Sequence, residues 1–393
     1  MKPFKFVLLS SVFCNATATR YSRSLSCPVV SLDATTNIWA QYSLQPNPYY
    51  REQVLDAANS IRDPNLKKKA LRIADVGTFF WLSTPTDLDR IPKMLEDVPC
   101  NHIVGIVLQG MHSQANCTSP KFKAIEPQTY KKAFVDPLAT IIKSHPTTAF
   151  ALILEPSSLP SVIIHSDLSS CAPLISTYRT NIPYALQTLN LPNVITYLDA
   201  GHGGNLGWDN RLAPTAKELS LIYTSANRPS QLRGIAANTA NYNSWDLAPG
   251  EFETSREIWP ANRAQNEQKY VRLLSDLLAK AGVPNHAVVD TSRNGVQGLR
   301  YDWLDWCNVD GAGFGRRPGA VGGALNGHVK NELADAFIWA VGGGVSDGTS
   351  DESEDGYDEP CGRVDAYKPS PGRGEWNQGY FEMLLREARP EIA

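Results

Sequence analysis

Seven short apolar runs, separated by longer mixed stretches, constrain the fold of this chain more than any other feature. Near-continuous hydrophobic strands of this kind are typical of parallel sheets that are buried on both faces. Parallel strands need crossover connections, and the stretch Arg263–Ala281 has the apolar spacing of a crossover helix. The runs are Thr78–Leu82, Ile103–Leu108, Ala149–Leu154, Val194–Leu198, Leu232–Ala236, Ala287–Val289 and Ala336–Val341.

The organisation of the chain favours one closed or nearly closed barrel over separate domains. No linker rich in Pro, Ser and Thr divides the sequence, and we find no internal repeat. We therefore predict an α/β fold: a distorted, seven-stranded parallel β/α barrel forming a single domain. A helical stretch is expected around Tyr50–Ala74. We therefore expect residues 19–76 to form an N-terminal lead and helix that pack on a barrel formed by residues 77–393.

The N-terminus has the pattern of a secretory signal. Lys2 and Lys5 precede the apolar run Phe6–Phe13, and Ala16-Thr17-Ala18 offers a small-residue cleavage site. We predict that residues 1–18 are a signal peptide and that the mature protein is secreted and extracellular. The alternative is an ordered N-terminal strand.

Charge and hydropathy exclude two classes of partner. The formal net charge is −3, which gives no general attraction to nucleic acid or to an anionic membrane. No later stretch of about 18 apolar residues could span a bilayer. We expect no nucleic acid partner, no membrane partner and a monomer.

The cysteines agree with an oxidising compartment. Cys14 lies in the predicted signal, so six cysteines remain in the mature protein and suggest three disulfides. Six cysteines can pair in 15 ways, and their spacing does not choose among them. No Cys-x-x-Cys pair occurs, so we expect neither a metal site nor a cofactor. The remaining six are Cys27, Cys100, Cys117, Cys171, Cys307 and Cys361.

Polar residues follow the apolar runs at the points where the strands should end. In a parallel barrel the chemistry sits at the carboxyl ends of the strands. For any one residue the alternative is a turn or a helix cap, but the repetition favours a common site. The residues are Glu155, Ser157, Asp199, His202, Asn238, Asn241, Asp290, Arg293 and Asp347.

Five ordered motifs over residues 77–393 resemble those of the cellulases of glycoside hydrolase family 6. The family fold, a distorted barrel of seven parallel strands, agrees with the independent strand prediction. The resemblance also implies the pairs Cys117–Cys171 and Cys307–Cys361, which leaves Cys27 with Cys100. The motifs are Phe80-Trp81-Leu82, the segment from Tyr197 to Trp208, the segment Asn238–Trp245, Asp305-Trp306-Cys307-Asn308 with Gly313-Phe314-Gly315, and Asp347–Asp351.

The catalytic positions depart from the family pattern. Family 6 enzymes cut β-1,4-glucosidic bonds with inversion, which needs a protonated acid for the leaving oxygen. The segment Glu155-Pro156-Ser157 matches the family's catalytic-acid segment, but Ser157 replaces the acid. Asn116 replaces the aspartate that assists the acid. A hydroxyl does not act as a carboxylic acid at any working pH.

Other site residues have changed as well. Gly110 replaces a tyrosine near the cleaved sugar, and Val341 and Val345 replace a lysine and a glutamate that hold the central sugar. Asp347 is retained and matches the family's proposed base. Two residues could supply a displaced acid, Glu155 and His112.

Several groups could still hold a sugar. Flat indole faces stack on the apolar faces of pyranose rings, and polar side chains bind hydroxyls. The resemblance implies a substrate-binding set consisting of Trp81, Asp199, His202, Trp208, Asn241 and Trp306. No separate carbohydrate-binding module is expected.

We interpret the sequence as a family-6-like barrel that binds cellulose or cello-oligosaccharides but lacks standard inverting hydrolysis. One alternative is an active β-glucan hydrolase with a displaced acid. Another is a protein-interaction role with the cleft closed.

The acidic loop Asp347–Glu359 is read as solvated, with a calcium site as its alternative.

Overall fold

The computed structural model describes residues 27–111, 117–118, 122–248, 262–303, 305–322 and 332–393. The predicted signal peptide, His112 and Asn116 lie outside the described residues.

All seven predicted apolar runs are strands, and they pair in parallel within one sheet. The sheet order is β1-β3-β4-β5-β6-β7-β9-β8, and β2 pairs with β3. The sequence missed β1 and the antiparallel β8, since each has only two residues and therefore no detectable pattern. The bounds are β1 Ser43–Leu44, β2 Phe80–Leu82, β3 His102–Leu108, β4 Ala149–Leu154, β5 Val194–Asp199, β6 Leu232–Ala237, β7 His286–Asp290, β8 Gly319–Ala320 and β9 Ala334–Ile338.

The two ends of the sheet come together beside β2. The Phe79 N–H donates to the Trp339 carbonyl at 3.0 Å, and the Trp81 indole donates to the Ala340 carbonyl at 2.6 Å. These bonds link the start of β2 to the end of β9, so the sheet is nearly closed. The predicted distorted barrel in a single domain is confirmed.

Both faces of the sheet are buried, which explains why its strands lack polar alternation. On β3, Val104, Ile106 and Leu108 belong to the core between the sheet and the outer helices. Ile103 and Val107 belong to the core inside the barrel. Alternate side chains therefore serve two cores, and no position from Ile103 to Leu108 carries a polar side chain.

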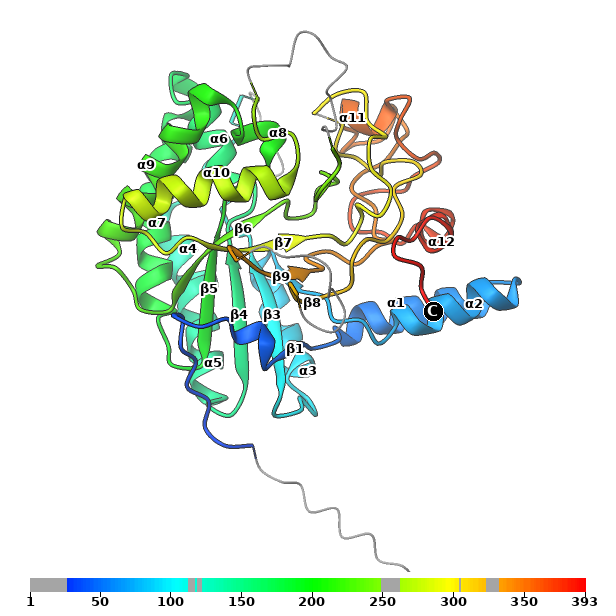
Figure 1. The fold of residues 1–393 in the computed structure, drawn as a ribbon, viewed down its shortest axis with the longest axis horizontal. Coiled ribbons are helices and arrows are strands. Elements are labelled where there is room, and N and C mark those ends of the chain that lie inside the picture. Colours follow the sequence, from blue (N-terminus) through cyan, green and yellow to red (C-terminus); the bar gives the residue numbers. More distant parts are fainter. Residues whose placement is uncertain (1–26, 112–116, 119–121, 249–261, 304, 323–331) are drawn as a thin grey trace, which may run out of the picture.

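The crossover helices surround this sheet (Figure 1). α10 confirms the predicted crossover helix in the stretch 263–281, beginning where the Asn266 side chain accepts from the Lys269 N–H. The bounds are α3 Ile91–Met94, α4 Pro127–Tyr130, α5 Asp136–Ser144, α6 Ser158–Ile164, α7 Ala172–Thr188, α8 Gly203–Leu206, α9 Asp209–Ser225, α10 Glu267–Lys280 and α11 Glu359–Gly362.

The expected helical stretch around 50–74 is two helices, so that prediction was wrong in detail. α1 spans Pro48–Ser60 and α2 spans Pro64–Ile73. Asp63 caps α2 by accepting from two backbone N–H groups, and Pro64 occupies its first turn. Both helices pack against α12, Gln378–Arg386, in a separate apolar cluster (Figure 1).

The N-terminal lead covers the amino ends of the strands. The Trp39 indole donates to the Tyr197 hydroxyl at 3.0 Å, and the Asn37 amide donates to the Asp335 carbonyl at 2.9 Å. The Asp335 carboxylate accepts two bonds of 2.8 Å from the buried Arg233 guanidinium. The chain itself therefore covers part of this end, while the polar residues that follow the strands lie at the opposite, carboxyl ends.

Three disulfides connect Cys27–Cys100, Cys117–Cys171 and Cys307–Cys361, as the resemblance implied. Within the described part of the chain, no helix combines the length and the apolar character that a membrane span requires.

Candidate functional site

Ser157, at the place of the expected acid, lies just beyond β4 and is exposed. Its backbone is left-handed, with φ 69°, a conformation in which aspartate and asparagine are enriched among non-glycine residues. Its N–H donates to Asp199 Oδ2 at 3.2 Å. The backbone therefore holds Ser157 exposed just beyond the carboxyl end of β4.

Glu155 faces away from solvent, two residues earlier. Its side chain accepts from the Gly110 N–H at 2.8 Å and from the Met111 N–H at 3.1 Å. Burial, with only 1% of the residue exposed, raises the pKa of Glu155 to about 7. The group anchors the chain after β3, and this geometry disfavours it as a displaced acid.

Asp199 is also buried rather than open to a ligand. Its Oδ2 accepts from the Gly201 N–H at 3.0 Å as well as from Ser157. Burial raises the pKa of Asp199 to about 6. Through these two bonds Asp199 ties the turn after β4 to the turn after β5.

His202 begins α8 and is held in one tautomer. Its Nδ1 accepts from the Gly204 N–H at 3.1 Å and lies 2.9 Å from the Asn243 amide nitrogen. Burial and the nearby Arg300 charge lower the pKa of His202 to about 3. The imidazole is therefore neutral, with Nε2 carrying the proton, and is suited to hydrogen bonding rather than to acid catalysis.

Asp347, the retained candidate base, is paired with a buried arginine. Arg293 Nη1 lies 2.8 Å from both carboxylate oxygens, and the Tyr242 hydroxyl donates to Oδ2 at 2.8 Å. The Asn308 N–H donates to the same oxygen at 2.9 Å. The Arg293 side chain is 0% exposed and the Asp347 side chain 14% exposed. The carboxylate is thus fixed as part of a charged network.

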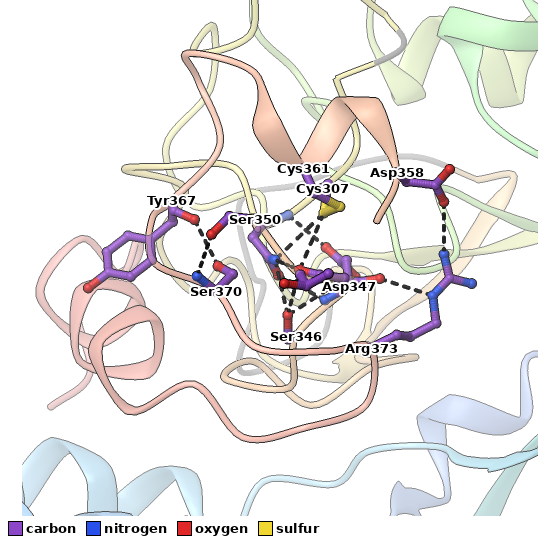
Figure 2. Close-up of a disulfide and its surroundings, with 12 residues drawn as sticks. Cys307, Ser346, Asp347, Ser350, Asp358, Cys361, Tyr367, Ser370 and Arg373 are labelled. Atoms are coloured by element: carbon purple, nitrogen blue, oxygen red, sulfur yellow. Dashed lines mark hydrogen bonds and ion pairs between the residues drawn. A yellow bond between two sulfur atoms is a disulfide. The ribbon is translucent and has the colours of Figure 1, made fainter. Parts of the chain in front are cut away.

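The loop that carries Asp347 is fastened from two sides (Figure 2). The Cys307–Cys361 disulfide lies beside it, and Ser346 donates to the Pro371 carbonyl at 2.8 Å. Arg373 donates to the Asp347 carbonyl at 3.0 Å and approaches Asp358 to 3.6 Å. These contacts keep Asp347 in place at the strand ends.

The three tryptophans of the predicted substrate set are half-buried at the same end of the barrel. Trp208 donates from its indole to the Gly204 carbonyl at 2.7 Å. Trp306 has the Arg373 guanidinium 5.6 Å from its ring centroid. With Trp81 bonded to Ala340, each ring is oriented by a polar contact, and each keeps part of its surface exposed.

Asn241 is half-buried and joined to a residue that sequence reasoning missed. Its Oδ1 accepts from Arg300 Nη1 at 3.1 Å, and Arg300 also donates to Asn243. Neither Arg300 nor Arg373 carried a sequence signal, because both stand in irregular loops. Tyr242 and Asn243 could have been found, since both stand inside the 238–245 motif.

Gly110 and Asn205 are both closely fitted to their surroundings. A Cβ placed on Gly110 would lie 3.0 Å from the Phe134 ring. Asn205 accepts from the His202 N–H at 2.9 Å and completes a capping box. The surroundings of Asn116 lie outside the described residues.

Comparison with known proteins identifies the family. The family model "Glycosyl hydrolases family 6" matches residues 39–388. The 1,4-beta-D-glucan cellobiohydrolase CEL6C of Podospora anserina is 49% identical over 92% of this chain and 90% of its own length. Exoglucanase 3 of Agaricus bisporus is 36% identical over 88% of this chain and 77% of its own length.

Solved structures give the same result. The CcCel6A catalytic domain complexed with p-nitrophenyl beta-D-cellotrioside has a TM-score of 0.82 at 34% identity, over 91% of this chain and 99% of that one. Cellobiohydrolase II (Cel6A) from Humicola insolens, in complex with glucose and cellotetraose, has a TM-score of 0.79 at 33% identity, over 91% and 100%. The chain therefore belongs to glycosyl hydrolases family 6.

Proposed function

We propose that this chain is a secreted, monomeric protein that binds β-1,4-glucan, as cellulose or cello-oligosaccharides, at the carboxyl ends of its strands. Related solved structures are complexes with p-nitrophenyl beta-D-cellotrioside or with glucose and cellotetraose. The three half-buried tryptophans offer stacking surface, and His202 and Asn241 offer polar groups for hydroxyls. Membership of the family supports this substrate class.

We further propose that standard inverting hydrolysis is strongly reduced. The observation that carries this is the exposed Ser157 in the acid's position. Loss of a general acid costs about 10²–10⁴ in rate. Glu155 and Asp199, the neighbouring carboxyls, are 1% and 2% exposed and bind backbone amides. To protonate a leaving oxygen, Glu155 or Asp199 would first have to move out of its buried, hydrogen-bonded position.

The second candidate function is active cellobiohydrolase-like hydrolysis with a displaced acid. The 49% identity to a protein named as a cellobiohydrolase favours it. The retained Asp347 would supply the base. The burial of Glu155 disfavours it as the acid, which leaves His112, outside the described residues, as the other acid candidate. A closed cleft that serves a protein partner is the third candidate.

The decisive test follows products from cellohexaose by chromatography over a day, beside calorimetric binding of the same sugar. The wild type is compared with Trp81→Ala for binding and with Ser157→Ala for turnover. We expect binding that weakens in Trp81→Ala, and hydrolysis about 10²–10⁴-fold slower than that of an active family 6 cellobiohydrolase assayed alongside.

Each other outcome favours a different candidate. Hydrolysis as fast as that of the active family member, equal in the wild type and Ser157→Ala, would overturn the proposed loss of hydrolysis and point to a displaced acid. His112→Ala would then test the acid outside the described residues. Neither binding nor product would favour the interaction role.

A further inference from the structure

We propose that Tyr301 and Val364 form an accessory contact for β-1,4-glucan at the margin of the candidate site, so that the protein grips an insoluble cellulose surface as well as a single chain. This inference rests on the proposed glucan binding. The proposed ligand of this accessory contact is a neutral polysaccharide. Neither Tyr301 nor Val364 belongs to the predicted sugar-binding set.

The two side chains are unusually exposed for their type. Tyr301 is 78% exposed and Val364 is 83% exposed. Tyr301 is the aromatic member of the large exposed apolar residues in the described part of the chain. The Tyr301 N–H bond to Asp365, the neighbour of Val364, brings the two segments together, and a tyrosine ring is suited to the CH face of a sugar.

The segments that carry them are fastened together. The Tyr301 N–H donates to Asp365 Oδ2 at 3.1 Å, and the Asp310 N–H donates to the Asp365 carbonyl at 2.8 Å. A bridge pairs Val309 with Ala366, and the Cys307–Cys361 disulfide joins the same two segments. Because the backbone is held in this way, less ordering entropy is lost when a ligand binds.

The loop also connects Tyr301 to the candidate site. Arg300, the preceding residue, donates to Asn241 at 3.1 Å. Trp303, two residues later, packs against Gly204 so closely that a Cβ there would collide with its ring. Trp306 follows at the Asp347 loop. Tyr301 therefore stands at the border of the predicted sugar-binding set.

The surrounding charges select the kind of polymer. Asp365 is buried and its carboxylate is taken by the Tyr301 N–H. The exposed carboxylate near Val364 is Glu359, whose side chain is 68% exposed, and Arg363 is already committed to Asp305 and Glu359. Carboxylates accept bonds from sugar hydroxyls and repel polyanions. This chemistry fits a neutral glucan better than a nucleic acid or an acidic polysaccharide.

The test measures partition onto microcrystalline cellulose by depletion, together with calorimetric binding of cellohexaose. Tyr301→Ala should weaken partition about 5- to 10-fold, the scale of one lost aromatic contact. Tyr301→Trp should keep or raise it, and Val364→Asp should weaken it. Leu221→Ala, which removes a 45% exposed apolar residue from α9, is the matched control and should change nothing.

The outcomes separate this inference from the proposed function. If the wild type binds both glucans and Tyr301→Ala partitions onto cellulose equally well, the accessory contact is wrong while glucan binding stands. If the wild type binds neither glucan, both proposals fall. Near-UV circular dichroism of each variant verifies that the fold is kept.

Discussion

Arg293 and Asp347 form a two-point ion pair, in which one guanidinium nitrogen lies 2.8 Å from both carboxylate oxygens. The Arg293 side chain is fully buried, so Asp347 is its neutralising partner as well as the candidate base. Removing one member of such a pair leaves an uncompensated buried charge. Asp347 therefore has a structural reason to be present, independent of catalysis.

We predict that Asp347→Ala lowers the free energy of unfolding by about 3–5 kcal/mol, as is typical when a buried pair loses one partner. Asp358→Ala is the matched control, since its ion pair with Arg373 is 3.6 Å long and both side chains are more than half exposed. It should cost less than about 1 kcal/mol.

Urea denaturation of both variants checks this prediction. Equal stability of the two would contradict the structural role of Asp347. The result also matters for kinetics, because lost activity in Asp347→Ala identifies a base only if that variant is folded under assay conditions.

Ser157→Asp should fold as well as the wild type without reaching cellulase-level activity. The left-handed backbone at Ser157 tolerates aspartate, so little strain is added. Catalysis also depends on positioning, and Asn116, Gly110, Val341 and Val345, which the family resemblance reads as replaced site residues, would be unaltered. Ser157→Asn is the isosteric control without an acid. Robust cellohexaose hydrolysis by the aspartate variant alone would mean that the rest of the site is still assembled.

The pH dependence of stability should reveal the buried Asp199. Its pKa in the folded state is raised to about 6, above its ordinary value of 3.8. Stability from this group is fully present below pH 3.8 and is lost as the pH rises through 6, because the folded state then resists an ionisation that the unfolded chain accepts.

Asp199→Asn removes this titration, while its side-chain oxygen can still accept the two backbone bonds. The free energy of unfolding of the variant, minus that of the wild type, should therefore rise by roughly 2–3 kcal/mol between pH 4 and 6. The lowered pKa of His202 acts in the opposite direction but is common to both proteins. Urea titrations at pH 4, 5, 6 and 7 measure the difference, and a flat difference would contradict the assignment.

The strands were predictable because burial on both faces leaves near-continuous apolar runs, in which polar residues such as Arg233 and Asp335 are few. The break between α1 and α2 was missed although Asp63 and Pro64 are ordinary start signals, since the apolar spacing continues across it. The contacts between the N-terminal lead and the amino ends of the strands were not predictable, because partners such as Trp39 and Tyr197 are far apart in sequence.

Within the candidate site, the sequence pointed to several of the residues, but it missed Arg300 and Arg373 and did not show what the residues contact. Asp199 was expected to meet sugar, yet it is 2% exposed and holds backbone amides of two turns. Such a role depends on how neighbouring loops meet, which residue spacing does not encode. Sugar binding by the remaining members of the set stays a prediction.

Gly110 should resist restoration of a larger side chain. A Cβ at this position would lie 3.0 Å from the Phe134 ring, and the Gly110 N–H is tied to Glu155 at 2.8 Å. Because neither the ring, which is 3% exposed, nor the tied backbone can move freely, Gly110→Ala should cost about 1–3 kcal/mol and Gly110→Tyr more.

Phe134→Leu would remove the ring that a side chain at 110 meets. The double variant Gly110→Ala/Phe134→Leu should therefore cost less than the sum of the two single variants, with a coupling of about 0.5–3 kcal/mol. Urea denaturation of all four proteins closes this cycle. Strict additivity would mean that the ring is not the obstacle, and that a tyrosine could be returned to this site without repacking Phe134.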